Sequence, residues 1–85
     1  MYSLVIKKQA SKGMLQLPKK TAEKFRRAFK ELAIDPHNTD YDIKTLTGRE
    51  GYRLRIGSFR AIYSIDAGQL VILVVKVGPR GGIYK

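Results

Sequence analysis

The sequence contains no cysteine and only one histidine, His37. Without cysteine the chain can have no disulfide bond, no thiol nucleophile and no zinc site with thiolate ligands. A lone histidine also excludes any site built on a histidine pair, and we expect His37 to lie in a surface loop. Acidic residues are few as well, at 7 against 17 lysines and arginines, which leaves a formal net charge of +10 over 85 residues. The length predicts a single domain, residues 1–85.

No run of apolar residues reaches the roughly 18–20 that a membrane-spanning helix needs. Residues 1–8 are not typical of a signal peptide, because their apolar stretch is short and its lysines follow instead of preceding it. We therefore expect a cytoplasmic protein without a membrane partner. So basic a domain has three kinds of natural partner, namely nucleic acid, an anionic membrane surface or an acidic protein. Charge alone does not choose among them.

Hydrophobic periodicity in the first half predicts a short strand followed by a helix. Residues 2–6 are an apolar run typical of a strand, whereas residues 10–17 are ambiguous because Gly13 disfavours a helix. From Pro18 onward, apolar residues recur at spacings of three and four, which predicts a helix that ends near Ile34, before Pro36. These helical apolar positions are Ala22, Phe25, Phe29, Leu32 and Ala33. Residues 35–42 read as a polar loop.

The second half changes to a period of two, which predicts strands at 52–56, 59–66 and 70–77. Two-residue turns at 57–58 and 67–68 separate them. The last strand is apolar on both faces apart from Lys76, so it should be central in the sheet or well covered. The expected fold is α+β in the order β-α-α-β-β-β, an antiparallel sheet with the N-terminal helices packed on one face.

The turn at 57–58 fixes the register of the hairpin around it. Arg55 then lies directly opposite Arg60, and Arg53 shares their face. Opposed like charges are destabilising, and the nearest acid in sequence, Glu50, lies outside the hairpin. Two interpretations remain: a solvated face on which salt screens the repulsion, or an anion site in which guanidinium forks bind phosphate.

Further candidates surround this arginine cluster. Arg80 follows the last strand, and a two-residue turn at 67–68 would place Val75 opposite Arg60, bringing the strand's end near the cluster. Tyr84 is either a hydrophobic plug or an aromatic platform that could also move a proton. Lys44 and Arg49 flank the cluster upstream. The acids at Asp35, Asp40 and Asp42 lack calcium-loop spacing, so neither a metal nor another cofactor is expected.

Essentially the whole chain resembles the RelE/ParE superfamily of bacterial and archaeal type II toxins, and the specific motifs lie in its second half. The resemblance rests on Leu46-Thr47-Gly48, on the stretch from Gly51-Tyr52-Arg53 through Phe59-Arg60 to Tyr63, and on Val77-Gly78-Pro79-Arg80 with Tyr84, all at matching spacings. It implies a RelE-like fold and a toxin that enters the ribosomal A site and cuts mRNA there without a metal. It also implies a cognate antitoxin, here expected to be acidic, that forms a hetero-oligomer with an otherwise monomeric toxin.

The resemblance also implies roles for single residues. Arg60 matches an arginine that contacts the scissile phosphate, Arg80 one that stabilises the transition state or leaving group, and Tyr84 a tyrosine that stacks on or activates the cleaved nucleotide. Arg53 and Arg55 match a basic pair that binds RNA, which Lys44 and Arg49 would extend. Pro79 stands where many members carry a histidine or lysine. Two alternatives stay open: a ParE-like inhibitor of DNA gyrase, or a catalytically weak module that binds RNA or an antitoxin.

Overall fold

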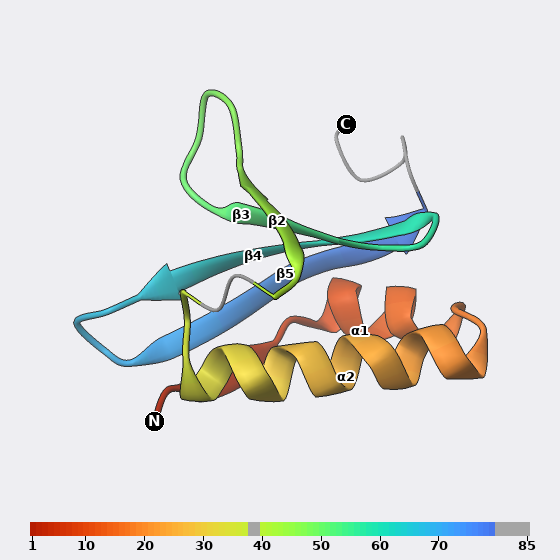
Figure 1. The fold of residues 1–85 in the computed structure, drawn as a ribbon, viewed down its shortest axis with the longest axis horizontal. Coiled ribbons are helices and arrows are strands. Elements are labelled where there is room, and N and C mark those ends of the chain that lie inside the picture. Colours follow the sequence, from red (N-terminus) through yellow and green to blue (C-terminus); the bar gives the residue numbers. More distant parts are fainter. Residues whose placement is uncertain (38–39, 80–85) are drawn as a thin grey trace.

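The computed structural model describes residues 1–37 and 40–79 (Figure 1). Its elements in chain order are β1 (Ser3–Ile6), α1 (Lys8–Leu15), α2 (Lys19–Ile34), β2 (Asp42–Thr45), β3 (Tyr52–Ile56), β4 (Phe59–Asp66) and β5 (Val71–Pro79). Within these residues the strands form a five-stranded sheet in the order β1-β5-β4-β3-β2. Both helices cover the same face of the sheet in Figure 1. The expected α+β class and the helices on one face are therefore confirmed.

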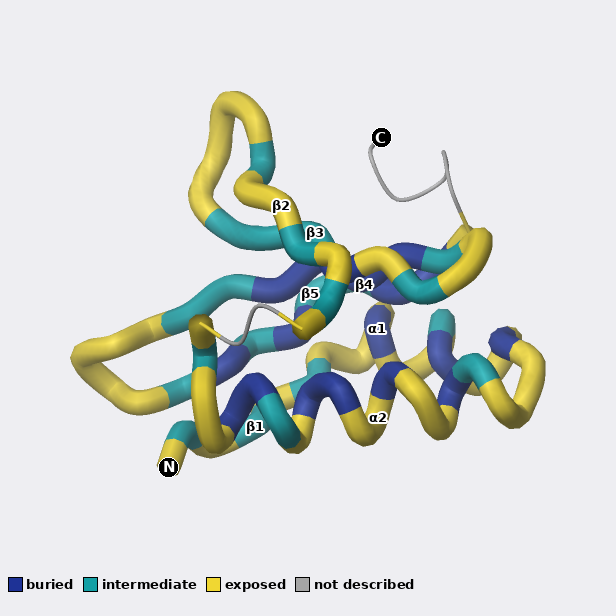
Figure 2. The backbone as a smooth tube through the Cα atoms, in the orientation of Figure 1, coloured by how far each residue is buried: buried dark blue, intermediate teal, exposed yellow. Residues whose placement is uncertain are grey.

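Helix α2 contributes more buried residues to the core than α1 does. Its buried residues are Ala22, Phe25, Ala28, Phe29, Leu32 and Ala33, which include every position of the predicted apolar stripe. The rings of Phe25 and Phe29 lie 5.9 Å apart, and both residues are fully buried. Figure 2 shows this buried side of α2 turned toward the sheet. The helix ends at Ile34 as predicted, and no helix in the described ranges is long and apolar enough to cross a membrane.

The segment around Gly13, whose secondary structure is ambiguous from the sequence, forms helix α1. The segment Lys8–Leu15 is helical and buries Ala10 and Met14. A Cβ atom on Gly13 would lie 1.9 Å from the carbonyl oxygen of Val77, which is far inside van der Waals contact. The glycine lowers the helix propensity, but it lets α1 approach the backbone of β5 closely. Tertiary packing therefore outweighs the local preference at this position.

The expectation of a polar loop over residues 35–42 is wrong at its end. Asp42 begins β2, which pairs antiparallel with β3 and forms one edge of the sheet. Tyr41 and Ile43 pack against the core from this segment. The Tyr41 hydroxyl also donates a hydrogen bond to a carboxylate oxygen of Glu31 on α2. That hydrogen bond, followed by partial burial, raises the pKa of Tyr41 to about 12.

The two hairpins differ in how well their registers could be predicted. In β3 and β4, Arg55 opposes Arg60 as expected. Between β4 and β5 the prediction is wrong, because Arg60 opposes Gly78 and not Val75. The turn spans residues 67–70 instead of 67–68, with Asp66 opposite Val71, and a bulge between Ile62 and Tyr63 shifts the register further. Strand β5 does lie inside the sheet, antiparallel to β4 and parallel to β1, as its apolar sequence indicates.

Candidate functional site

The outer face of the sheet, turned away from the helices, carries two cross-strand rows of residues. On the opposite face Leu54, Ala61 and Tyr63 pack into the core, so strand alternation turns the residues between them outward. The row nearer the β3–β4 turn contains Asp42, Arg55, Arg60 and Gly78. The row nearer the β2–β3 loop contains Lys44, Arg53, Ile62 and Lys76. The predicted positions Lys44, Arg53, Arg55 and Arg60 thus share one face.

Arg60 stands at the centre of this face. It lies on β4, the middle strand of the sheet, and its exposed fraction of 9% makes it the only buried charged residue among those described. A guanidinium keeps its proton at any physiological pH. When it is partly removed from water it attracts an anion more strongly than an exposed one does. The position of Arg60 therefore suits direct contact with a phosphate.

A hollow of about 190 Å³, which we call the turn hollow, opens beside Arg60. Its wall consists of Arg55, Gly57, Ser58 and Arg60. Gly57 has a φ of +60°, a conformation that the tight turn needs and that glycine adopts without strain. The two arginines face one another across the hairpin, so an oxyanion in this hollow could accept hydrogen bonds from both.

The arginine pair is balanced by an acid that the sequence did not indicate. Arg55 Nε lies 2.7 Å from Asp42 Oδ2, and both side chains are partly exposed. The acid comes from β2, and neither strand of the hairpin itself provides it. The alternation of Tyr41 and Ile43 with Asp42 and Lys44 is the one signal that could have revealed this strand.

A second hollow, the loop hollow, lies where the β2–β3 loop meets the sheet. It measures about 300 Å³ and is lined by Thr45, Leu46, Thr47, Arg49 and Arg53. The Leu46 amide donates to the Gly51 carbonyl oxygen over 3.1 Å and closes the loop. In Figure 1 this loop rises from the sheet on the side away from the helices. Arg49, predicted only as a flanking residue, thus shares a hollow with Arg53.

Two of the predicted catalytic residues follow strand β5 in the sequence. Arg80 and Tyr84 lie outside the described residues. Strand β5 ends at Pro79, which opposes Phe59, and the preceding Gly78 opposes Arg60. The described part of β5 therefore ends beside the turn hollow.

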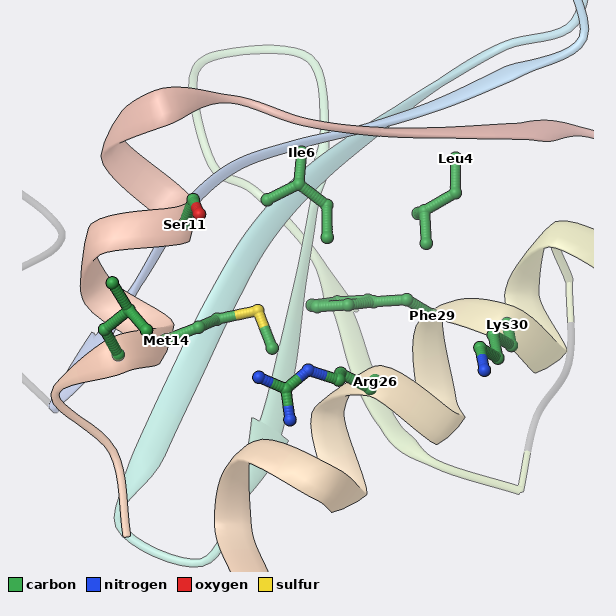
Figure 3. A pocket seen from close by; sticks show the side chains of 8 residues that line it. Leu4, Ile6, Ser11, Met14, Arg26, Phe29 and Lys30 are labelled. Carbon is green, nitrogen blue, oxygen red and sulfur yellow. The ribbon is translucent and has the colours of Figure 1, made fainter. Parts of the chain in front are cut away.

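An apolar groove lies on another side of the molecule, between β1 and the two helices. One hollow of about 290 Å³ and another of about 480 Å³ both have Leu4 and Lys30 in their walls. Figure 3 shows Leu4 and Ile6 of β1 above Phe29 of α2, with Arg26 and Lys30 along the same helix. The remaining lining residues are Ser11, Met14, Leu15, Met1, Tyr2, Ala33 and Ile34. The groove is therefore apolar in its floor and basic along α2.

Comparisons with known proteins place the chain in a family. Residues 4–84 match the family described as the ParE toxin of the type II toxin–antitoxin system parDE. The RelE1 protein of Methanocaldococcus jannaschii is 34% identical over 86 residues, covering 99% of this chain and 96% of that protein. The chain thus belongs to the RelE/ParE superfamily of type II toxins, as the sequence motifs imply.

Solved structures agree with this assignment. RelE in the RelE–RelB complex of Pyrococcus horikoshii OT3 superposes with a TM-score of 0.82 at 33% identity, covering 95% of this chain and 97% of that chain. The isolated Escherichia coli RelE toxin gives a TM-score of 0.78 at 21% identity, covering 99% and 92%. The second likeness concerns the fold alone. Together they confirm the expected RelE-like fold.

Proposed function

We propose that this toxin is a ribosome-dependent endoribonuclease that cuts mRNA in the cytoplasm and so stops translation. The observation that carries the proposal is the opposed pair Arg55 and Arg60 at the turn hollow. A toxin that acted only by protein contact would not need two guanidinium groups converging on one small hollow. The similarity to RelE proteins supports the same activity.

The proposed reaction is attack of an RNA 2′-oxygen on the adjacent phosphorus. The new bond forms a cyclic phosphate, the bond from phosphorus to the 5′-oxygen breaks, and the 2′-hydroxyl proton must leave while the 5′-oxygen gains one. Negative charge grows on the phosphate oxygens during this step. Arg60, assisted by Arg55, would neutralise that charge, and Arg80 would act on the transition state or the leaving oxygen.

Proton transfer requires a different group, because arginine remains protonated near neutral pH and is a poor base. Tyr84 is our candidate, since positive neighbours favour the phenolate form of a tyrosine. A Tyr84→Phe variant keeps the aromatic ring and removes the hydroxyl. It should lose cleavage of ribosome-bound mRNA, and undiminished cleavage would assign proton transfer to another group.

Induction in growing cells tests the proposed activity against its alternatives. We expect protein synthesis to stop first, with messages cut, while an Arg60→Met variant expressed at the same level leaves synthesis running. Continued translation with intact messages would contradict the proposal. An unaffected growth rate would indicate a module that only binds RNA or an antitoxin.

The match to the ParE family supports a second candidate function, inhibition of DNA gyrase by protein contact. The same induction experiment separates the two candidates. A gyrase inhibitor would induce the DNA-damage response while translation continued. Its effect should also survive Arg60→Met, because gyrase binding requires no phosphate site.

The proposal includes an acidic antitoxin as partner, bound in the apolar groove. The RelE–RelB complex of P. horikoshii supports such a partner. A net charge of +10 and the rim residues Arg26 and Lys30 favour an acidic amphipathic segment over a neutral one. Leu15 and Ile34 line the groove with exposed fractions of 79% and 68%, so they can be changed with little effect on the fold.

Charge substitutions at the groove test this partner. Leu15→Asp and Ile34→Asp should each weaken antitoxin binding about tenfold, because each places a hydrated carboxylate in an apolar contact and repels an acidic partner. Leu70→Asp is the matched control, since Leu70 is an exposed apolar residue outside the groove. Equal affinity for all three variants and the wild type would exclude the groove as the docking surface.

A further inference from the structure

The β3–β4 turn places a serine in the wall of the turn hollow. Ser58 is exposed, and it lines this hollow together with Arg55 and Arg60. Ile56 and Phe59, which flank the turn, pack against the core on the helix side, so the hollow opens on the outer face. Figure 1 shows the turn at one end of the sheet. A modifying enzyme can therefore reach Ser58 from solvent, and a group attached there stays at the hollow.

The charges around Ser58 favour an anion. Arg55 and Arg60 occupy opposed positions of the hairpin, where like charges repel. Asp42 Oδ2 lies 2.7 Å from Arg55 Nε in a partly exposed ion pair. Neither arginine need be unpaired to take a further anion, because each guanidinium has five N–H donors. A group with more negative charge and more acceptor oxygens than a carboxylate would bind both arginines at once.

We propose that Ser58 is a phosphorylation site, and that its phosphate, held in the turn hollow by Arg55 and Arg60, switches the toxin off. A phosphoserine carries a charge of about −1.5 to −2 at neutral pH and has three acceptor oxygens. Guanidinium groups bind such a phosphate through charge-assisted hydrogen bonds. The loss of activity rests on the proposed function, whereas capture of the phosphate by the arginine pair does not.

The modification requires a protein kinase and a nucleoside triphosphate. Ser58 Oγ attacks the γ-phosphorus, a new O–P bond forms, and the bond from that phosphorus to the bridging oxygen of the departing nucleoside diphosphate breaks. The hydroxyl proton passes to a base of the kinase. A phosphatase reverses the change by transferring the phosphoryl group to water. The arginines on both sides of Ser58 suit a kinase with an acidic substrate cleft.

The loop hollow also contains hydroxyl groups, but in a less suitable setting. Thr45 and Thr47 line it together with Arg53. Arg53 opposes Ile62 across the hairpin and not a second arginine. A phosphate on either threonine would therefore meet no opposed arginine pair. Ser58 combines exposure to solvent with two arginines that face one another across the turn.

The test uses the full-length chain with phosphoserine encoded at position 58. A ³¹P NMR pH titration follows the phosphate itself, whose second pKa is ordinarily about 6. Two neighbouring guanidinium groups favour the dianion, so this pKa should lie below its ordinary value. In the same phosphoprotein with Arg55→Gln, the pKa should return toward the ordinary value. The melting temperature should rise by a few degrees in the phosphoprotein, because the phosphate offsets the repulsion between the arginines.

Phosphorylation should also close the hollow to substrate. Affinity for a 2′-deoxy oligonucleotide, which has phosphates but cannot be cleaved, should fall about tenfold, and cleavage of ribosome-bound mRNA should be lost. Treatment with a phosphatase should restore both. Ser3 is the matched control, because it is an exposed serine on the edge strand β1 and does not line the hollow. Phosphorylated Ser3 should titrate at its ordinary pKa and change the oligonucleotide affinity by about twofold at most.

The proposal would be overturned if phosphorylated Ser58 titrated like phosphorylated Ser3. It would also be overturned if the pKa fell but the oligonucleotide affinity did not change. A third contrary result would be mass spectrometry that finds no phosphate on Ser58 in protein isolated from its native cells, both in growth and in starvation.

Failure of the proposed function has a separate readout, which is whether the unmodified wild type cleaves ribosome-bound mRNA. A lowered phosphate pKa and weaker oligonucleotide binding in a protein that never cleaves mRNA would keep Ser58 as the modification site and reject the nuclease.

Discussion

Arg55 Nε lies 2.7 Å from Asp42 Oδ2, so the arginine that faces Arg60 across the hairpin already holds an anion. The carboxylate reduces the repulsion between the two guanidinium groups, which occupy directly opposed positions. It also occupies donors that the turn hollow would offer to a phosphate. A phosphate that enters this hollow therefore competes with Asp42 for Arg55.

Asp42→Asn should release Arg55 and raise the affinity for a phosphate-bearing oligonucleotide about 1.4- to fivefold. The range corresponds to the roughly 0.2–1 kcal/mol that an exposed ion pair contributes. The free energy of unfolding should fall by no more than about 1 kcal/mol. Titration with oligonucleotide and thermal unfolding measure the two effects, and Glu23→Gln on α2 serves as the control for net charge. A lower affinity in Asp42→Asn would mean that the acid helps to hold the ligand.

Arg60→Met should reduce cleavage by about 10²–10³-fold, the loss expected when one preorganised charge-stabilising group is removed. The fold should remain intact or become slightly more stable, because methionine keeps an aliphatic stem and removes a like-charge contact. Cleavage kinetics and the melting temperature provide the two measurements. A large fall in melting temperature would show that Arg60 is needed for folding and not for the site.

Gly13→Ala should destabilise the protein by about 1–3 kcal/mol through overpacking. Helix propensity alone predicts the opposite sign, a gain of about 1 kcal/mol in α1. The close approach to Val77 decides the outcome, since the new methyl group would lie 1.9 Å from a backbone oxygen. Gln9→Ala, at an exposed position of the same helix, is the control. Chemical denaturation measures both variants, and a stabilised Gly13→Ala would contradict the packing of α1 on β5.

The stability should fall at alkaline pH because of Tyr63. Burial, with a further contribution from Tyr52, raises the pKa of Tyr63 to about 12 from an ordinary value near 10. The unfolded chain therefore loses this proton first, so stability is unaffected below about pH 10 and decreases between pH 10 and 12. The expected loss by pH 12 is on the order of 2 kcal/mol. Tyr63→Phe should show a smaller loss over this range, and an unchanged pH profile would refute the assignment.

The sequence predicts some of these features and misses others for physical reasons. The register that opposes Arg55 to Arg60 follows from a two-residue turn, which leaves the hairpin a single pairing. No comparable rule predicts the register of β5, because its turn is longer and a bulge intervenes near Ile62. The pairing of Gly78 with Arg60 is therefore known from the structure and could not be predicted from the sequence.

The ion pair between Asp42 and Arg55 is a second feature that the sequence pattern does not predict. Strand β2 has only the four residues Asp42–Thr45, too few for a clear alternation, and it exists because β3 offers it a neighbour. Gly13 is similar, since its close contact with β5 depends on residues far away in sequence. Local patterns indicate which residues can form a site, but long-range pairing decides which of them meet.

The central claim is that the turn hollow serves cleavage of mRNA on the ribosome. The most direct measurement is primer extension on a defined mRNA bound to purified ribosomes, with the purified protein added. We predict a new 3′ end within the codon of the A site for the wild type, none for Arg60→Met, and none when ribosomes are left out. Intact mRNA with the wild type, or equal cutting by Arg60→Met, would contradict the claim.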